Sequence, residues 1–409
     1  MQRSSERILT THVGSLIRPE PLRAFLREKE AGQAFDQAAY AQCLKEAVAE
    51  VVRKQAAIGI DVISDGEFGK AISWAQYALF RLGGFERRPF KPDAGNPFTR
   101  GADRTRFSEF YAELDSRDKV ETVLDSVAGA PITYTGQREL QLDIDNFKAA
   151  LRGVKVAEGF LPVAAPASAI PDRKNEYYKN ADDLQQAIGD AMHTEYKMII
   201  DAGFLVQLDD ARAAVSYDRM VPPRTMQDYR SWLARQVEIT NYAIKGLPRE
   251  KIRYHICWGS WPGPHSSDVP FGAIADLVLK VRAGAYSIEA ANPRHEHEWT
   301  VWQKRRLPAD TVLIPGVISH ATNIVEHPEL IAQRIVRFAK LVGRENVIAS
   351  TDCGFAQVTY FARVHPQIMW AKLEALVAGA RLASKELWRK RKRTVKRAAA
   401  KRAKKRATG

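Results

Sequence analysis

Short apolar runs alternate with longer amphipathic stretches along most of the chain. Eight runs are rich in Val, Ile and Leu and end in polar or glycine-containing turns, at residues 8–13, 60–65, 160–165, 204–209, 252–257, 285–290, 312–317 and 346–351. Runs of this length and composition are typical of buried strands in a parallel sheet. Because helical patterns lie between them, the alternation predicts an α/β fold, a closed (β/α)8 TIM barrel.

The amphipathic stretches carry ordinary helix signals. Residues 328–343 begin with Pro328, which suits a first helical position, and end at Gly343. Apolar side chains recur between these ends at helical spacing, at Ile331, Ile335, Phe338 and Val342. Residues 183–203 stop in the same way at Gly203. We expect such helices to cover the outside of the barrel.

One connection is too long for a plain strand-to-helix loop. Residues 75–158 separate the second and third runs and include the turn-rich segment 89–103 and the segment "PITYTG" at 131–136, which has the pattern of an extra strand. Loops of this length are usually functional or mobile. We interpret residues 75–158 as a surface excursion, either a flap over one end of the barrel or a simple decoration.

Composition limits the class of protein. With 409 residues and 45% hydrophobic content, the chain can bury a large core. No apolar run is long enough to span a bilayer, and residues 1–15 lack the apolar segment of a secretory signal. Three cysteines do not make a disulfide framework. We therefore expect a cytoplasmic protein with no membrane contact, whose thiols are free for metal binding or chemistry.

The net charge of +14 is concentrated at the carboxyl end. Residues 385–409 hold 13 of the 62 Lys and Arg and one of the 48 acidic residues, so the remainder of the chain is nearly neutral. We predict a barrel domain over 1–380 and a basic low-complexity tail over 385–409, disordered or partly helical. The tail is either a solvated appendage or a contact for nucleic acid; the lack of aromatics beyond Trp388 favours the first.

In barrels of this kind the chemistry lies at the carboxyl ends of the strands. Side chains that can bind a metal, a proton or a substrate lie at or just after the ends of seven of the eight runs. They are Ser15, Glu67, Asp209, His255 with Cys257, Glu289, His320, and Asp352 with Cys353. A closed barrel brings these ends together around one rim. The pattern predicts a single site to which distant parts of the chain contribute.

His255 and Cys257 are the strongest indication of a metal. Residues two apart on a strand point to the same side, although such a pair alone is more often part of a core. Cys353 and Glu289 at neighbouring strand ends change the balance. Thiolate, imidazole and carboxylate together suit Zn²⁺, and two thiolates plus one imidazole with a fourth position that can open is the pattern of a catalytic site.

A set of segments covering residues 8–357 resembles the catalytic barrel of cobalamin-independent methionine synthase and its short single-barrel relatives. The segments occur in the family's order and are "THVGS", "GIDVISDGE", "VQLDD", "YHICWG", "YSIEAANPR", "LIPGVISH" and "STDCGF". The resemblance implies that His255, Cys257, Glu289 and Cys353 bind zinc. It also implies that Ser15, Glu67 and Asp209 bind the amino-acid substrate, and that His320 assists methyl transfer.

The function that the resemblance implies is a zinc-dependent S-methyltransferase. A methyl group would move from a methyl-tetrahydrofolate-type donor to the thiol of homocysteine, giving methionine. Zinc would make the thiol a thiolate, which is the nucleophilic form. His320 or Asp352 would supply a proton, through water, to the departing nitrogen of the donor.

Two other interpretations remain open. The family's pterin-contacting tryptophan is not evident in "VAAPASAI" after the third run, and the chain has no room for a second barrel, so the donor is less defined than the thiol. Residues 291–299 also resemble zinc-dependent alkyltransferases that open epoxides with coenzyme M, in which case Arg294 would face the anion. The second alternative is a protein with a structural zinc ion that binds nucleic acid through its tail.

Overall fold

The computed structural model describes residues 1–89, 101–117, 125–359 and 362–389. Eight parallel strands form one sheet in the order β1-β11-β10-β9-β8-β7-β5-β2. Their bounds are β1 (Leu9–Thr10), β2 (Val62–Ile63), β5 (Glu158–Ala164), β7 (Leu205–Asp209), β8 (Ile252–Ile256), β9 (Ala285–Ile288), β10 (Val312–Ile318) and β11 (Ile348–Thr351). A parallel bridge between Thr11 and Val62 joins the two ends of the sheet, so the barrel closes. Each strand lies within or overlaps one of the eight predicted runs, and the predicted (β/α)8 fold is confirmed.

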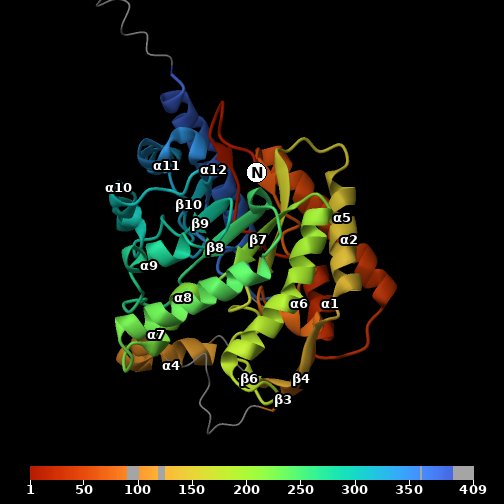
Figure 1. The fold of residues 1–409 in the computed structure, drawn as a ribbon. Helices are drawn as coiled ribbons and strands as arrows, with labels where there is room; N and C mark the ends of the chain where they lie inside the picture. Colours follow the sequence, from red (N-terminus) through yellow and green to blue (C-terminus); the bar gives the residue numbers. More distant parts are fainter. Residues whose placement is uncertain (90–100, 118–124, 360–361, 390–409) are drawn as a thin grey trace, which may run out of the picture.

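Helices surround the strands (Figure 1). They are α1 (Glu20–Glu30), α2 (Gln37–Ile58), α5 (Gln137–Leu151), α6 (Ala181–Asp201), α7 (Arg212–Met220), α8 (Met226–Ala243), α9 (Phe271–Val278), α10 (Val301–Lys304), α11 (Pro328–Val342) and α12 (Pro366–Leu387). Helix α11 has the predicted start and buries the predicted face, including Ile331, Ile335 and Phe338. Burying side chains of this size stabilises the fold by about 1.5–3 kcal/mol each.

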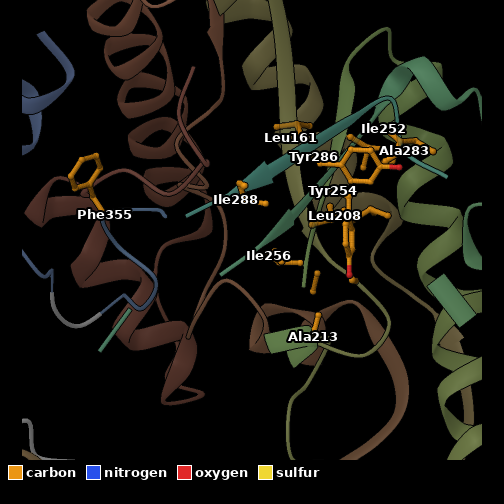
Figure 2. Packing of buried hydrophobic residues seen from close by; sticks show 14 of the residues in the cluster. Leu161, Leu208, Ala213, Ile252, Tyr254, Ile256, Ala283, Tyr286, Ile288 and Phe355 are labelled. Carbon is orange, nitrogen blue, oxygen red and sulfur yellow. The ribbon is translucent and has the colours of Figure 1, made fainter. Parts of the chain in front are cut away.

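The alternation of side chains along β8 places the chemistry inside the barrel. Ile252, Tyr254 and Ile256 belong to the core between strands and helices, together with neighbours on β7 and β9 (Figure 2). Because successive side chains of a strand point to opposite faces, His255 points into the barrel. Cys257, the next residue but one, follows on the same side.

The excursion adds a small sheet and helices of its own. Its elements are a 3-10 helix (Gln76–Phe80), β3 (Leu82–Arg88), α3 (Ala102–Arg106), α4 (Ser108–Arg117) and β4 (Asp125–Tyr134), and β3-β4 is extended by β6 (Lys174–Asn175). The expected strand at 131–136 is the end of β4. Figure 1 shows α4 and the small sheet at the end of the barrel opposite to the end of α12. Part of the turn-rich segment, and residues 118–124, lie outside the described residues.

Helix α12 continues past the predicted domain boundary at residue 380 and ends at Leu387. Trp388 follows the helix, and its indole Nε1 donates to the Ser5 carbonyl over 3.0 Å, which ties this end to the start of the chain. The tail beyond residue 389 lies outside the described residues, and its role stays a prediction. In the described part of the chain, no helix combines the length and apolarity needed to cross a membrane.

Candidate metal centre and cavity

A cavity of about 600 Å³ opens at the carboxyl ends of the barrel strands. Six of the predicted site residues line it: Ser15, Glu67, Asp209, His255, Cys257 and Cys353. The excursion and two loops add Trp74, Arg104, Tyr111, Leu114, Asp115 and Trp261. The cavity has the size of ordinary small-molecule sites, and it is larger than one amino acid, so it has room for a second small molecule. The walls that come from α3 and α4 are what the flap interpretation expects.

His255, Cys257 and Cys353 meet at the wall of this cavity. One ligand atom from each lies within 4.8 Å of the others. All three side chains are buried, and Cys257 and Cys353 are free thiols. This grouping brings together residues almost 100 positions apart in the chain, as the strand-end pattern predicts.

The protonation of His255 suits a ligand. Its Nδ1 lies 3.1 Å from the Ser287 hydroxyl, while its buried Nε2 has no hydrogen-bond partner in the described part of the chain. Burial, with a smaller effect of Arg253, lowers the His255 pKa to about 3, so the imidazole is neutral. A neutral imidazole that is fixed through one nitrogen and free at the other is the usual state of a metal-binding histidine.

The two thiols also fit a metal. The Cys257 contact and burial hold the pKa of the Cys353 thiol well above its usual range. Two buried thiols at this distance cannot both ionise without a compensating cation. The donor set of one imidazole nitrogen and two sulfurs is one that Zn²⁺ accepts in tetrahedral sites with an open position. The residues present therefore fit the ion.

Glu289 lies near this cluster but does not belong to it in the structure. Its Oε1 accepts from the Trp258 amide over 3.1 Å, and its Oε2 accepts from Asn292 Nδ2 over 2.7 Å and Arg294 over 2.9 Å. The three residues whose ligand atoms share one small volume do not include Glu289. Its role as the fourth ligand stays a prediction.

Two acidic residues face the cavity beside the cluster. Asp209 ends β7 and accepts from Gln207 Nε2 over 2.8 Å, while Glu67 pairs with Lys70 over 3.1 Å. Burial and the Glu67 carboxylate hold the pKa of Asp209 well above its usual range. A cation placed against the two carboxyl groups would favour the ionised form of Asp209. The pair is therefore suited to an ammonium group.

Glycine makes room for the groups in this part of the cavity. A Cβ on Gly14 would lie 2.7 Å from a carboxylate oxygen of Glu67, and Gly14 has a φ of 141°, which other residues avoid. A Cβ on Gly354 would lie 1.9 Å from the Ser15 hydroxyl. These approaches explain why "THVGS" and "STDCGF" carry glycine next to the polar residue. The predicted substrate contacts of Ser15, Glu67 and Asp209 themselves stay predictions.

His320 and Asp352 lie outside the residues that line the cavity. Asp352 is fully buried and accepts from the amides of Ala290 and Ala291, both over 2.8 Å, and from Asn292 over 2.9 Å. These bonds tie the segment after β9 to the end of β11. His320 is buried, neither ring nitrogen has a partner among the described residues, and burial lowers its pKa to about 3. Their proposed part in proton transfer stays a prediction.

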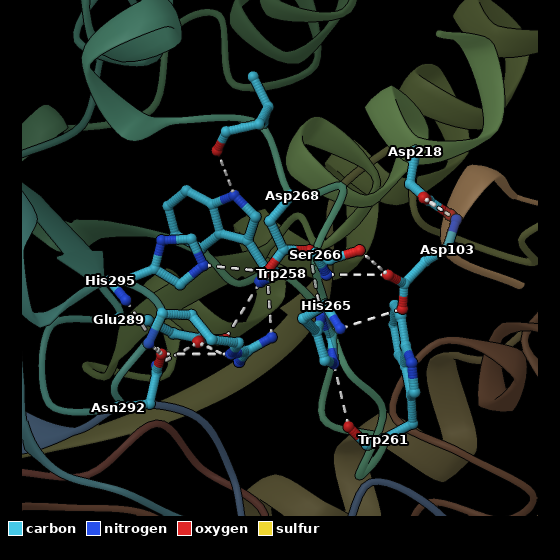
Figure 3. A network of polar contacts seen from close by, with 12 residues as sticks. Asp103, Asp218, Trp258, Trp261, His265, Ser266, Asp268, Glu289, Asn292 and His295 are labelled. Carbon is cyan, nitrogen blue, oxygen red and sulfur yellow. Dashed lines mark hydrogen bonds and ion pairs between the residues drawn. The ribbon is translucent and has the colours of Figure 1, made fainter. Parts of the chain in front are cut away.

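A polar network that the sequence did not reveal joins the excursion to the cavity (Figure 3). The Asp103 carboxylate accepts from the Tyr111 hydroxyl over 2.8 Å, from the amides of His265 and Ser266, and from the Ser266 hydroxyl over 2.7 Å. Tyr111 accepts in turn from the Trp261 indole over 3.0 Å. The excursion is thus fastened to the loop that follows Cys257.

The partners of the site residues carried only partial signals in the sequence. Ser287 is two residues before Glu289, on the same face of a strand, and the parallel register sets it beside His255. Lys70 is three residues from Glu67, a short-range spacing. Asp103 and Asp268 each have one partner nearby in the sequence, Tyr111 and His265. Their other partners belong to different loops, so the sequence carried no signal for those contacts.

The fold and the cavity define a (β/α)8-barrel enzyme with a His–Cys–Cys cluster at its strand ends. The family model described as the cobalamin-independent synthase catalytic domain matches residues 8–85 and 166–372, well over half of the chain. The chain belongs to this family, as its sequence pattern predicts, and is thereby an S-methyltransferase in its enzyme class.

Individual relatives agree over almost the whole length. A methionine synthase from Saccharolobus solfataricus is 24% identical over 389 residues, which is 93% of this chain and 96% of the relative. The Bacillus subtilis protein YxjH is 26% identical over 90% of this chain and 92% of its own length. Among solved structures, a B12-independent methionine synthase from Shewanella sp. W3-18-1 in complex with selenomethionine superposes with a TM-score of 0.68 at 18% identity, over 93% of this chain and 99% of that one. That likeness concerns the fold.

Proposed function

We propose that this protein transfers a methyl group to the thiol of homocysteine, giving methionine, at a zinc ion held by His255, Cys257 and Cys353. The observation that carries the proposal is the cluster itself. Three ligand atoms lie within 4.8 Å of one another on a cavity of about 600 Å³, and one of them, His255 Nε2, has no other partner among the described residues. The Saccharolobus relative named a methionine synthase supports the thiol acceptor.

The chain's own groups would orient the amino acid. Asp209 and Glu67 would accept from its ammonium group, and Ser15 would donate to its carboxylate. Zinc, when bound, makes a coordinated thiol a thiolate and therefore a good nucleophile. The remaining volume, walled by Tyr111, Trp261 and Trp74, would take the methyl donor, for which we propose the methyl-tetrahydrofolate type. His320 or Asp352 would supply a proton, through water, to the donor's nitrogen.

Two observations weaken the other candidate functions. Arg294, the expected partner of a coenzyme M sulfonate, is already paired with Glu289 over 2.9 Å and with Asp268 over 3.1 Å. A structural zinc site needs only its four ligands, whereas this cluster lies on a large cavity with further acidic groups. Both observations favour the methyltransferase over these alternatives.

The test is a titration of the purified protein loaded with zinc, and in parallel with cobalt as a spectroscopic substitute. Homocysteine should release about one proton per site, because the thiol must ionise to bind the metal, and should change the cobalt spectrum. Coenzyme M should do neither at the same concentration. If neither thiol perturbs the metal, thiol activation is wrong; if only coenzyme M does, the acceptor is wrong.

A further inference from the structure

A second cavity lies at the opposite end of the barrel, where the strands begin. Its volume is about 380 Å³, which is within the range of small-molecule sites. Helices α8 and α9 end beside it, and β8 and β9 begin there. Four basic side chains line it, and none of its described lining residues is acidic; the four are Lys245, Arg249, Lys280 and Arg282. Because the candidate metal centre lies at the carboxyl ends of the strands, the two cavities are separate.

The four cations have no anionic partner in the structure. All four residues are exposed, and none of them forms an ion pair within the described part of the chain. Arg249 is fixed at the cavity wall, since its Nε donates to the Ala283 carbonyl over 3.0 Å. Like charges around one cavity repel each other, and an anion placed between them would relieve that repulsion.

The acidic residues of this region do not neutralise the cavity. Asp276 pairs with Arg230 over 2.7 Å, and Asp310 pairs with Arg3 over 3.5 Å. Glu250 lies just before β8, but it is not among the residues that line the cavity. The cavity therefore keeps a net positive charge.

The ends of the two helices do not explain the basic residues. Cations are common at helix carboxyl ends, where they compensate exposed carbonyl groups. Here neutral donors already serve those carbonyls: Asn241 Nδ2 donates to the Lys280 carbonyl over 3.0 Å, and the Tyr286 hydroxyl lies 2.8 Å from the Val281 oxygen. Backbone amides bond two carbonyls in the last turn of α8. The charged groups are therefore not needed as caps and can bind a ligand.

The basic tail begins at this same end of the barrel. The amino terminus of Met1 donates to the Glu250 carbonyl over 2.9 Å, and the Trp388 indole donates to the Ser5 carbonyl over 3.0 Å. Five residues of chain span at most about 18 Å, so the Glu250 oxygen and the indole nitrogen lie within about 25 Å of each other. Residues 390–409, which follow in the chain, hold 11 Lys and Arg and no acidic residue.

We propose that Lys245, Arg249, Lys280 and Arg282 bind the phosphate groups of a nucleic acid, and that the tail extends this contact. Guanidinium and ammonium groups are the usual partners of backbone phosphates. A recessed cavity suits a phosphate on a flexible strand better than the flat surface of a bilayer. This binding is separate from the proposed function and does not depend on it, and it leaves the methyl-transfer cavity at the other end accessible.

The experiment measures the fluorescence anisotropy of a labelled oligouridylate of about 20 nucleotides, titrated with full-length protein between about 50 and 200 mM salt. The test variant is Lys280→Gln with Arg282→Gln, whose side chains make no hydrogen bond or ion pair within the described residues. The control variant is Arg138→Gln with Lys179→Gln. These two exposed residues lie at the starts of α5 and α6, at the other end of the barrel, and line neither cavity. Circular dichroism and zinc content check the fold of each variant.

Both variants lower the net charge by the same amount, so a difference between them reports the position of the charge. Each lost phosphate contact should make the slope of log affinity against log salt less steep by about 0.7. For two contacts this corresponds to roughly 25-fold weaker binding by Lys280→Gln with Arg282→Gln at about 0.1 M salt. The control should bind the oligonucleotide almost as tightly as wild type.

Equal affinities of the test and control variants would overturn the proposal, because net charge or the tail alone would then explain the binding. The absence of binding by wild type would overturn it as well. Vesicles of phosphatidylserine and phosphatidylcholine are the second probe. If wild type binds these vesicles and not the oligonucleotide, the partner is a membrane surface and the proposal is wrong.

Discussion

The buried imidazole of His295 should make the stability of this protein fall between neutral and alkaline pH. Its Nδ1 lies 2.7 Å from a Glu298 oxygen and its Nε2 lies 3.1 Å from an Asp268 oxygen, while the ring stacks on Trp258. Burial alone would lower the pKa of His295, but the hydrogen bonds to Asp268 and Glu298 outweigh it and raise the pKa to about 9. His295 is therefore charged in the folded protein at neutral pH.

The size of the effect follows from linkage between proton binding and folding. A pKa of about 9 in the folded state against about 6.5 in the unfolded chain corresponds to roughly 3 kcal/mol. Because the folded-state value is the higher one, the contribution is complete below about pH 6.5 and is lost as the pH rises through about 9. The sign is opposite to that of a buried carboxylate paired with a cation.

Urea unfolding of wild type and of His295→Gln at pH 6 and pH 10, at a fixed zinc concentration, measures this contribution. Groups that titrate in both proteins cancel in the comparison, so wild type should lose roughly 3 kcal/mol more than His295→Gln between the two pH values. The exposed His297, changed to Gln, is the control and should follow wild type. Equal pH dependence in wild type and His295→Gln would refute a charged His295 in this network.

Three further predictions concern the site. Cys353→Ser should lose zinc affinity by about a hundredfold or more while its circular dichroism spectrum stays that of wild type; unchanged zinc binding would remove Cys353 from the site. Asp103→Ala leaves Tyr111 and two amides unpaired, so the free energy of unfolding should fall by about 2–4 kcal/mol and KM should rise, and an unaltered KM would show that the excursion does not shape the cavity. Asp209→Asn should weaken homocysteine binding in calorimetry by about ten- to a hundredfold, because the ammonium loses a charged partner; equal affinity would place the amino group elsewhere.

The barrel could be predicted from the sequence because its signals are local. Each apolar run is bounded by turns and is long enough for one strand, and helix signals such as Pro328 and Gly343 occur between runs. The excursion could be recognised by its length, but its attachment could not. Asp103 is held by Ser266, more than 160 residues away, and no periodicity reports such a contact.

The position of His255, Cys257 and Cys353 at the carboxyl ends of strands predicted that they meet, because a closed barrel sets the ends of all strands around one rim. It does not say what each side chain contacts there. Glu289 follows β9 as expected, but its carboxylate is held by Arg294, which the sequence left as a partner for a substrate anion. Which partner a buried carboxylate takes is decided by tertiary contacts, in this case by Asp268 behind Arg294.

X-ray absorption at the zinc edge, with and without homocysteine, identifies the atoms that bind the metal. We predict two sulfur ligands in the protein alone, from Cys257 and Cys353, and three after homocysteine is added, with His255 retained. A sulfur count that stays at two when homocysteine is saturating, or zinc that binds without sulfur ligands, would contradict the proposal that these residues hold a metal that takes the substrate thiol.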